Sequence, residues 1–212
     1  MSQRIPMSER ILQTADRLFY GKGIRAVGVD AIAATAGISK RSLYDTYPSK
    51  EALVEAYLRR RVRPAPASDQ PPAARVLELF QRLHDWFAGG DFRGCPFVNA
   101  VAELGDDCSA ARRIAAQYRA ERMGLVRDWL AEAGAREPER LAVQIMLLAD
   151  GAIASMLVHG DPGVAWTAAD AARALMRAAG VRMPDRMVPG GMVPDGMVAE
   201  PHENAPTAQD AA

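Results

Sequence analysis

Residues 29–50 constrain the fold of this chain more than any other segment, because they combine helical spacing with two sharp turn signals. Ile32, Ala33 and Ala36 place small apolar side chains on one face of a short helix. Gly37 follows where helices commonly end in a left-handed turn, which glycine adopts without strain. Ser39 then suits the N-cap of a second short helix, because its hydroxyl can accept a free backbone N–H bond. The segment therefore predicts two short helices joined by a tight turn.

The second of these helices is predicted to have one buried anchor and a polar outer surface. Leu43 is its one large aliphatic side chain and should pin it to the core. The remaining side chains are polar or charged: Lys40, Arg41, Ser42, Tyr44 and Asp45. Pro48 ends the helix, and Ser49 is the expected N-cap of the next one. Short polar and cationic side chains on the first turn of a protruding helix suit a groove in DNA.

Seven residues of this segment are predicted to contact DNA: Ser39, Lys40, Arg41, Ser42, Tyr44, Tyr47 and Lys50. Arg41, with Lys40 and Ser42, can read base edges, because arginine matches the O6 and N7 acceptors of guanine. The two tyrosines and Lys50 are expected to position the phosphate backbone, and Lys50 adds a full charge at a helix N-terminus that already attracts phosphate. The alternative is an ordinary helical hairpin with a solvated charged face, because turn signals of this kind are common.

A preceding amphipathic helix is predicted over residues 8–21, with Ser8 as N-cap and Gly21 as stop. In this order the chain resembles the N-terminal domain of the TetR family of transcriptional regulators. The matching residues are Ile11, Ala15, Leu18, Phe19, Gly23, Ile32, Ala33, Ala36, Gly37, Ile38, Ser39, Leu43, Tyr44, Tyr47, Ser49, Lys50, Glu51 and Leu53. They cover roughly the first quarter of the chain, and a weaker likeness continues through residues 94–99.

The resemblance implies an all-helical, homodimeric regulator with one DNA-binding head per subunit and a response to a small-molecule effector. It implies that the helix matching residues 39–46 lies in the major groove of operator DNA, with phosphate contacts at Tyr44 and Lys50. Either a repressor or an activator fits, and we expect a repressor.

The chain departs from the family pattern at the first short helix. The family usually has threonine or serine where Val27 and Gly28 stand, and Gly28 can cap only weakly. Asp30 favours the helix dipole but would repel DNA if it pointed outward. A phenylalanine is usual at Tyr47. These departures make the first short helix a poorer expected DNA contact without affecting the predicted fold.

The formal net charge is zero, but the charges are distributed unevenly. Residues 1–63 carry 12 basic and 6 acidic side chains, whereas residues 64–212 carry 14 basic and 20 acidic ones. A basic head on an acidic body indicates that nucleic acid binds at one end only. Two cysteines and the lack of a signal peptide predict a cytoplasmic protein without disulfides.

The whole chain is predicted to be all-α, with about nine helices. We expect a DNA-binding domain over residues 1–63, a proline-rich linker over 64–72, a ligand-binding and dimerisation domain over 73–180 and a disordered tail over 181–212. Beyond the head, the predicted helices span residues 51–63, 73–88, 96–104, 109–134, 138–159 and 165–179. The tail repeats Met-Val-Pro or Met-Val-Ala with a period of five residues, a pattern with no functional explanation.

The segment from Leu141 to Val158 is apolar nearly all round. It approaches membrane-spanning length, but Gln144, Asp150 and Ser155 argue against a membrane helix. A helix that is apolar on every side must be buried on every side. We therefore expect homodimerisation through this helix and the one from Ala165 to Ala179. A fully buried core helix in a monomer is the alternative.

An apolar or amphipathic effector is expected to bind among side chains of the body helices. The candidates are Phe80, Phe87, Phe97, Met123, Trp129 and Met146, and core packing explains them equally well. Cys95 lies between Gly94 and Pro96 at a predicted helix start, where its thiolate would be favoured. A redox or electrophile sensor is therefore one reading of Cys95, and a small buried hydrophobe is the other.

Other classes of function have less support in the sequence. A helical enzyme is disfavoured, because the three histidines show no ligand spacing and the chain has no glycine-rich phosphate loop or metal-binding motif. We expect no catalytic residue, metal or cofactor. A helical adaptor that binds only protein is disfavoured by the basic head.

Overall fold

The computed structural model describes residues 5–64, 67–105 and 108–183. Within these ranges the chain forms nine α-helices and no strand, which confirms the predicted all-α fold. The helices are α1 (Met7–Lys22), α2 (Val29–Ala36), α3 (Lys40–Thr46), α4 (Lys50–Arg61), α5 (Pro72–Ala88), α6 (Pro96–Leu104), α7 (Ser109–Glu132), α8 (Pro138–His159) and α9 (Val164–Ala178).

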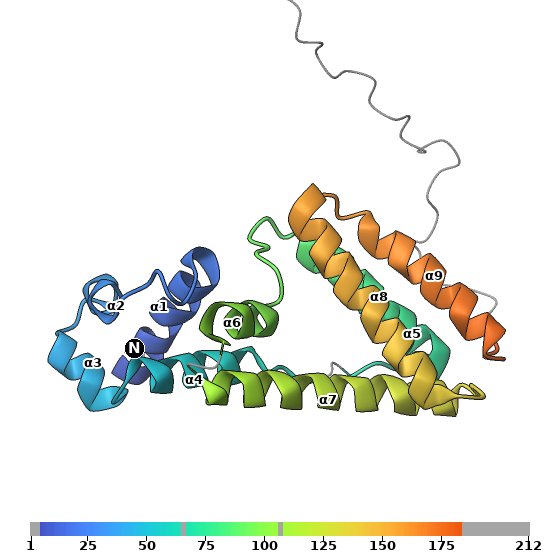
Figure 1. Cartoon of the computed structure of the whole chain (residues 1–212), viewed down its shortest axis with the longest axis horizontal. Helices are drawn as coiled ribbons and strands as arrows, with labels where there is room; N and C mark the ends of the chain where they lie inside the picture. Colours follow the sequence, from blue (N-terminus) through green and yellow to red (C-terminus); the bar gives the residue numbers. More distant parts are fainter. Residues whose placement is uncertain (1–4, 65–66, 106–107, 184–212) are drawn as a thin grey trace, which may run out of the picture.

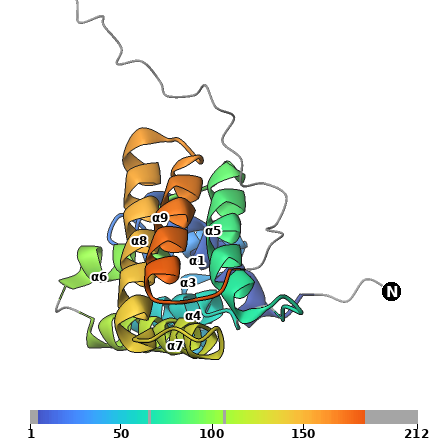
Figure 2. The ribbon, with the colours of Figure 1, turned by 90° about the vertical axis from the view of Figure 1, so that its right-hand side faces the viewer.

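The helices form an elongated molecule with two ends (Figure 1). Helices α1 to α4 gather at one end, and α5, α8 and α9 pack together at the other. Helix α7 runs along the molecule from the first group to the second, and α6 lies between them. Seen from the far end, α8 and α9 lie side by side with α5 next to them (Figure 2). The small head is therefore joined to the body by α4, α6 and α7.

Each end of the molecule has its own hydrophobic core. The core of the head is built on Ile11, Leu43 and Tyr57, and it also includes Phe97 of α6 and Ile114 of α7. The apolar interior of the head therefore extends past residue 63 into helices that the sequence assigned to the body. The division of the chain into domains at residues 63 and 72 remains a prediction.

The core of the body is formed by α5, α8, α9 and the second half of α7. Helix α8 contributes Leu141 and Ile145 to this core, but its other side leaves Leu147 62% exposed and Val158 76% exposed. By length and composition alone, α8 is the one helix among the described residues that could span a membrane, and core helices pass the same test. In the single chain α8 is thus half-buried rather than covered all round.

Every predicted helix end lies within two residues of the end in the structure. Helix α1 begins at Met7 after Pro6 rather than after a Ser8 cap, and it continues through Gly21 to end at Lys22, before Gly23 with a φ of 91°. Helix α7 begins at Ser109 as predicted but ends at Glu132, two residues before the predicted end at residue 134. The Met-Val-Pro repeat of the predicted tail lies outside the described residues.

Candidate nucleic-acid interface

The turn between α2 and α3 has the geometry that its residues predict. Gly37 adopts a left-handed conformation with φ of 65°, and the N–H of Ile38 donates to the carbonyl of Ala33 at 3.0 Å. Arg10 of α1 supports the same turn, because its Nη2 donates to the carbonyl of Ala36 at 2.5 Å. These bonds terminate α2 sharply and fix the point from which α3 departs.

Helix α3 is anchored by one side chain and exposes its cations. The Ser39 hydroxyl accepts a bond from the N–H of Ser42 at 3.0 Å, so Ser39 is the predicted N-cap. Leu43 is fully buried in the core of the head, whereas Lys40 and Arg41 are exposed. Seven residues give α3 too few internal bonds to be stable alone, so this cap and this anchor fix its position.

Tyr44 and Ser42 differ in their availability at the surface of α3. Tyr44 is 40% exposed. Ser42 is half-buried, and its hydroxyl lies 2.9 Å from that of Ser39. The hydroxyls of the two serines are therefore hydrogen-bonded to each other in the free protein, while the Tyr44 side chain is exposed to solvent.

An ion pair links the two short helices at their exposed ends. Lys40 Nζ lies 2.8 Å from Oδ1 of Asp30, and both side chains are more than half exposed. The hydrogen bond to Asp30 raises the pKa of Lys40 above its ordinary value. The sequence identified Asp30 as a departure from the family pattern but did not show that it pairs with a predicted DNA-contacting residue.

Lys50 opens α4 next to a second serine cap. The Ser49 hydroxyl accepts a bond from the N–H of Ala52 at 3.1 Å, as predicted. Glu51 accepts hydrogen bonds from its own backbone N–H and from Ser49, which lower the pKa of its carboxyl. Lys50 is half-buried and is the first residue of α4.

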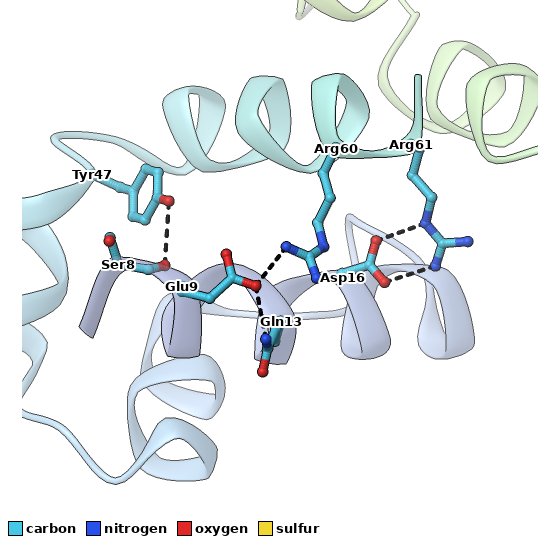
Figure 3. A network of polar contacts seen from close by, with 7 residues as sticks. All are labelled: Ser8, Glu9, Gln13, Asp16, Tyr47, Arg60 and Arg61. Carbon is cyan, nitrogen blue, oxygen red and sulfur yellow. Dashed lines mark hydrogen bonds and ion pairs between the residues drawn. The ribbon is translucent and has the colours of Figure 1, made fainter. Parts of the chain in front are cut away.

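Tyr47 follows α3 and is attached to α1. Its hydroxyl donates to the backbone carbonyl of Ser8 at 3.4 Å (Figure 3). Burial raises the pKa of Tyr47 above its ordinary value. A phenylalanine could not make this bond, so the hydroxyl that departs from the family pattern has a contact within the head.

A ladder of polar contacts holds α4 against α1 (Figure 3). Arg60 Nη1 lies 2.7 Å from Oε1 of Glu9, which lowers the pKa of that carboxyl. Two turns further along α1, Arg61 donates two hydrogen bonds to Asp16 at 2.6 and 2.9 Å. The Arg61 guanidinium also lies over the ring of Tyr20, 4.3 Å from its centroid. Two of the basic residues counted in the head therefore brace it instead of facing DNA.

Tyr20 and Arg25 of the head form hydrogen bonds with the segment that precedes and contains α6. The Tyr20 hydroxyl donates to the carbonyl of Gly94 at 3.1 Å and accepts a bond from the N–H of Arg93 at 2.9 Å. The N–H of Arg25 donates to Oε2 of Glu103 at 3.0 Å, and the Arg25 guanidinium donates to the backbone carbonyl of Glu103. A movement of α6 would therefore act directly on α1 and on the loop before α2.

The six predicted effector-contacting residues are divided between the two cores. Phe80, Phe87 and Met146 are buried in the body, with Met123 and Trp129 packed against them, whereas Phe97 belongs to the core of the head. A cavity of about 190 Å³ lies elsewhere, between α1, α4 and α6, and none of the six lines it. Phe97 instead stacks on Tyr118 of α7, with ring centroids 4.1 Å apart.

Cys95 lies at the start of a helix, as predicted, but its thiol pKa is raised rather than lowered. It is the N-cap of α6 and receives backbone hydrogen bonds from Phe97 and Val98, which favour the thiolate. The Cys95 side chain is only partly exposed, and its burial outweighs these two hydrogen bonds and raises its pKa. This direction favours the interpretation of Cys95 as a small hydrophobe, and its role as a sensor thiol stays a prediction.

A helix-turn-helix on a basic head, carried by a helical body, defines a DNA-binding regulator. Residues 11–57 match the family described as bacterial regulatory proteins, tetR family. A TetR-type regulator from Streptomyces avermitilis is 33% identical, with 84% of this chain and 100% of that chain covered and a TM-score of 0.75. A TetR-family regulator from Streptomyces coelicolor is 30% identical, with 82% and 95% covered and a TM-score of 0.74.

The chain belongs to the TetR family of transcriptional regulators. An uncharacterised helix-turn-helix regulator from Mycobacterium tuberculosis is 37% identical over 76 residues, which are 36% of this chain and 38% of that protein. The chain thus matches less than half the length of this curated relative.

Proposed function

We propose that α3 is the recognition helix of an operator-binding repressor and that Arg41, Lys40 and Ser42 face the base edges. The observation that carries the proposal is the division of α3 into one fully buried anchor, Leu43, and an exposed cationic first turn. An α-helix fits the major groove, where the N-terminal residues of a recognition helix contact the bases. Arg41 makes no hydrogen bond or ion pair with the described residues, so its guanidinium is available for guanine.

Phosphate contacts are proposed for Ser39, Tyr44, Tyr47 and Lys50. Tyr44 is exposed beside the cations of α3, and Lys50 stands at the N-terminus of α4, where free backbone N–H groups attract an anion. Tyr47 already donates to Ser8, so its hydroxyl would meet a phosphate only as an acceptor or after exchanging partners. Its contribution to DNA binding is therefore expected to be smaller than that of Lys50.

The dimer is proposed to form through the outer sides of α8 and α9. On α8, exposed apolar or small residues recur at the spacing of one helix face: Val143, Leu147, Gly151, Ala154 and Val158. Small residues at the middle of this stripe let a second helix approach closely, and the large ones at its ends supply apolar area. A two-fold dimer presents two copies of α3, so its operator should consist of two inverted half-sites.

The effector is proposed to be an apolar or amphipathic small molecule that binds among the body helices and changes the position of the head. The bonds of Tyr20 and Arg25 to the segment at residues 93–103 supply a physical route, because any shift of α6 moves their partners. As a soluble DNA-binding regulator, the protein is expected to work in the cytoplasm.

The experiment that tests this function is selection of DNA from a random-sequence pool by the full chain. The selected fragment is then compared with scrambled competitor at rising salt concentration. We expect a preference of about a thousandfold or more, inverted half-sites and a steep loss of affinity with salt. Equal binding of the selected fragment and the competitor would contradict the proposal.

A further inference from the structure

The ion pair between Asp30 and Lys40 lies on the exposed edge of the helix-turn-helix. Asp30 is in the first turn of α2, and Lys40 is the first residue of α3. Their charged atoms are 2.8 Å apart, and their side chains are 74% and 55% exposed. One partner is a proposed DNA contact and the other carries the same charge as DNA, so the pair must affect how the head binds.

The positions of the two residues explain why the pair forms. A carboxylate is favourable at the N-terminus of α2, whereas a cation is unfavourable at the N-terminus of α3. The Asp30 carboxylate therefore stabilises its own helix and offsets the misplaced charge of Lys40. An ammonium has three donors, and Asp30 uses one of them, so Lys40 can still donate to another acceptor.

We infer that Asp30 is a specificity-determining residue that restrains Lys40 from the phosphate backbone and leaves it able to donate to a base edge. The inference rests on the proposed function and goes one step further, because it assigns a role to a residue outside the proposed contact set. Sequence-independent binding depends on neutralising phosphates and releasing counterions. A lysine whose charge is already balanced contributes little to the free energy of sequence-independent binding, and the nearby carboxylate repels phosphate.

Binding to a base edge depends less on net charge than binding to phosphate does. The O6 and N7 atoms of guanine are neutral acceptors, so Lys40 can bind them without separating from Asp30. Asp30 therefore lowers the affinity for non-specific DNA more than the affinity for the operator. Arg41, which has no such partner among the described residues, supports both kinds of binding.

The test compares the wild type with Asp30→Asn on the selected fragment and on scrambled DNA. The asparagine keeps the size of the side chain and an N-terminal acceptor for α2 but removes the charge. We expect the affinity for scrambled DNA to rise about fivefold to tenfold, with a salt slope steeper by about one. The affinity for the selected fragment should change by less than about twofold, so the specificity ratio falls about fivefold.

Two further variants separate the ion pair from a general effect of charge. Asp45→Asn removes an exposed carboxylate on α3, which has no ion-pair partner among the described residues, and it should leave the specificity ratio unchanged. In a Lys40→Gln background, Asp30→Asn should no longer lower the ratio, because the restrained cation is absent.

The outcomes distinguish this inference from the proposed function. If the wild type does not discriminate between the two DNAs, both fail together. If the wild type discriminates but Asp30→Asn keeps the ratio, or Asp45→Asn lowers it equally, the inference alone is overturned. Persistence of the Asp30→Asn effect in the Lys40→Gln background would also overturn it.

Discussion

Arg119 of α7 donates two hydrogen bonds to Asp150 of α8, at 2.7 and 2.6 Å. Asp150 is the one charged residue between Leu141 and Val158, and each partner is 35% exposed. The bond to Asp150 raises the pKa of Arg119 above its ordinary value. The pair explains how a carboxylate is accommodated in this largely apolar segment, because its charge is balanced by a cation with matching geometry.

Removal of Arg119 should destabilise the body, because the Asp150 carboxylate is then left without its ion-pair partner. We expect Arg119→Met to lower the free energy of unfolding by about 1–2 kcal/mol, a range that allows for the partial exposure of the pair. Adding Asp150→Leu should recover most of this loss, because the unpaired charge is then absent. Urea unfolding followed by circular dichroism, at one fixed protein concentration, measures both values. Additive losses in the double variant would contradict the explanation.

The features that the sequence predicted well depend on interactions within a few residues. Ser39 and Ser49 cap their helices as expected, because an N-cap bond reaches only three residues along the chain. Gly37 ends α2 in the left-handed conformation for the same local reason. The bounds of α6 were predicted without error, since proline at its first position and glycine after its last are strong signals.

The contacts that could not be predicted from the sequence join residues that lie far apart in the chain. No local pattern pairs Tyr20 with the backbone at residues 93–94, 73 and 74 positions away. The same is true of Arg119 and Asp150, which are 31 positions apart. The pKa of Cys95 depends on burial by other helices, so its direction could not be read from the helix N-terminus alone.

Arg41 and Lys50 are predicted to contribute to DNA binding in different ways. Arg41→Ala should cost about 1–3 kcal/mol on the selected fragment and relax the preference at one base pair, because a contact to guanine is lost. Lys50→Ala should weaken every DNA alike and reduce the salt slope by about one, because a phosphate contact is lost. Fluorescence anisotropy with single-base variants of the fragment measures both effects. The assignment of base and phosphate roles is wrong if the two variants show the same pattern.

Leu147 is predicted to be central to the dimer interface. Its side chain is 62% exposed in the single chain, so Leu147→Glu should leave the fold of the subunit intact. Burial of an unpaired carboxylate costs several kcal/mol, so the dimer Kd should rise by about a hundredfold or more. Light scattering on a size-exclusion column measures the mass. Val98→Glu is the matched control, because Val98 is a 51% exposed apolar residue on α6 and its substitution should leave the dimer intact. A monomeric control or a dimeric Leu147→Glu would contradict this interface.

Cys95 is predicted to react slowly at neutral pH. Its pKa is raised above 9.0 by burial, so the thiolate fraction near pH 7.5 is smaller than that of an ordinary cysteine. Because the folded state retains this proton longer than the unfolded state, the group stabilises the fold below pH 9.0, and that stability is lost as the pH rises through the folded pKa. Alkylation by iodoacetamide, followed at the Cys95 peptide by mass spectrometry, should be at least about tenfold slower than in the unfolded chain. It should accelerate as the pH rises above 9.0. Labelling of the folded protein at pH 7 as fast as that of the unfolded chain would restore Cys95 as a candidate sensor thiol.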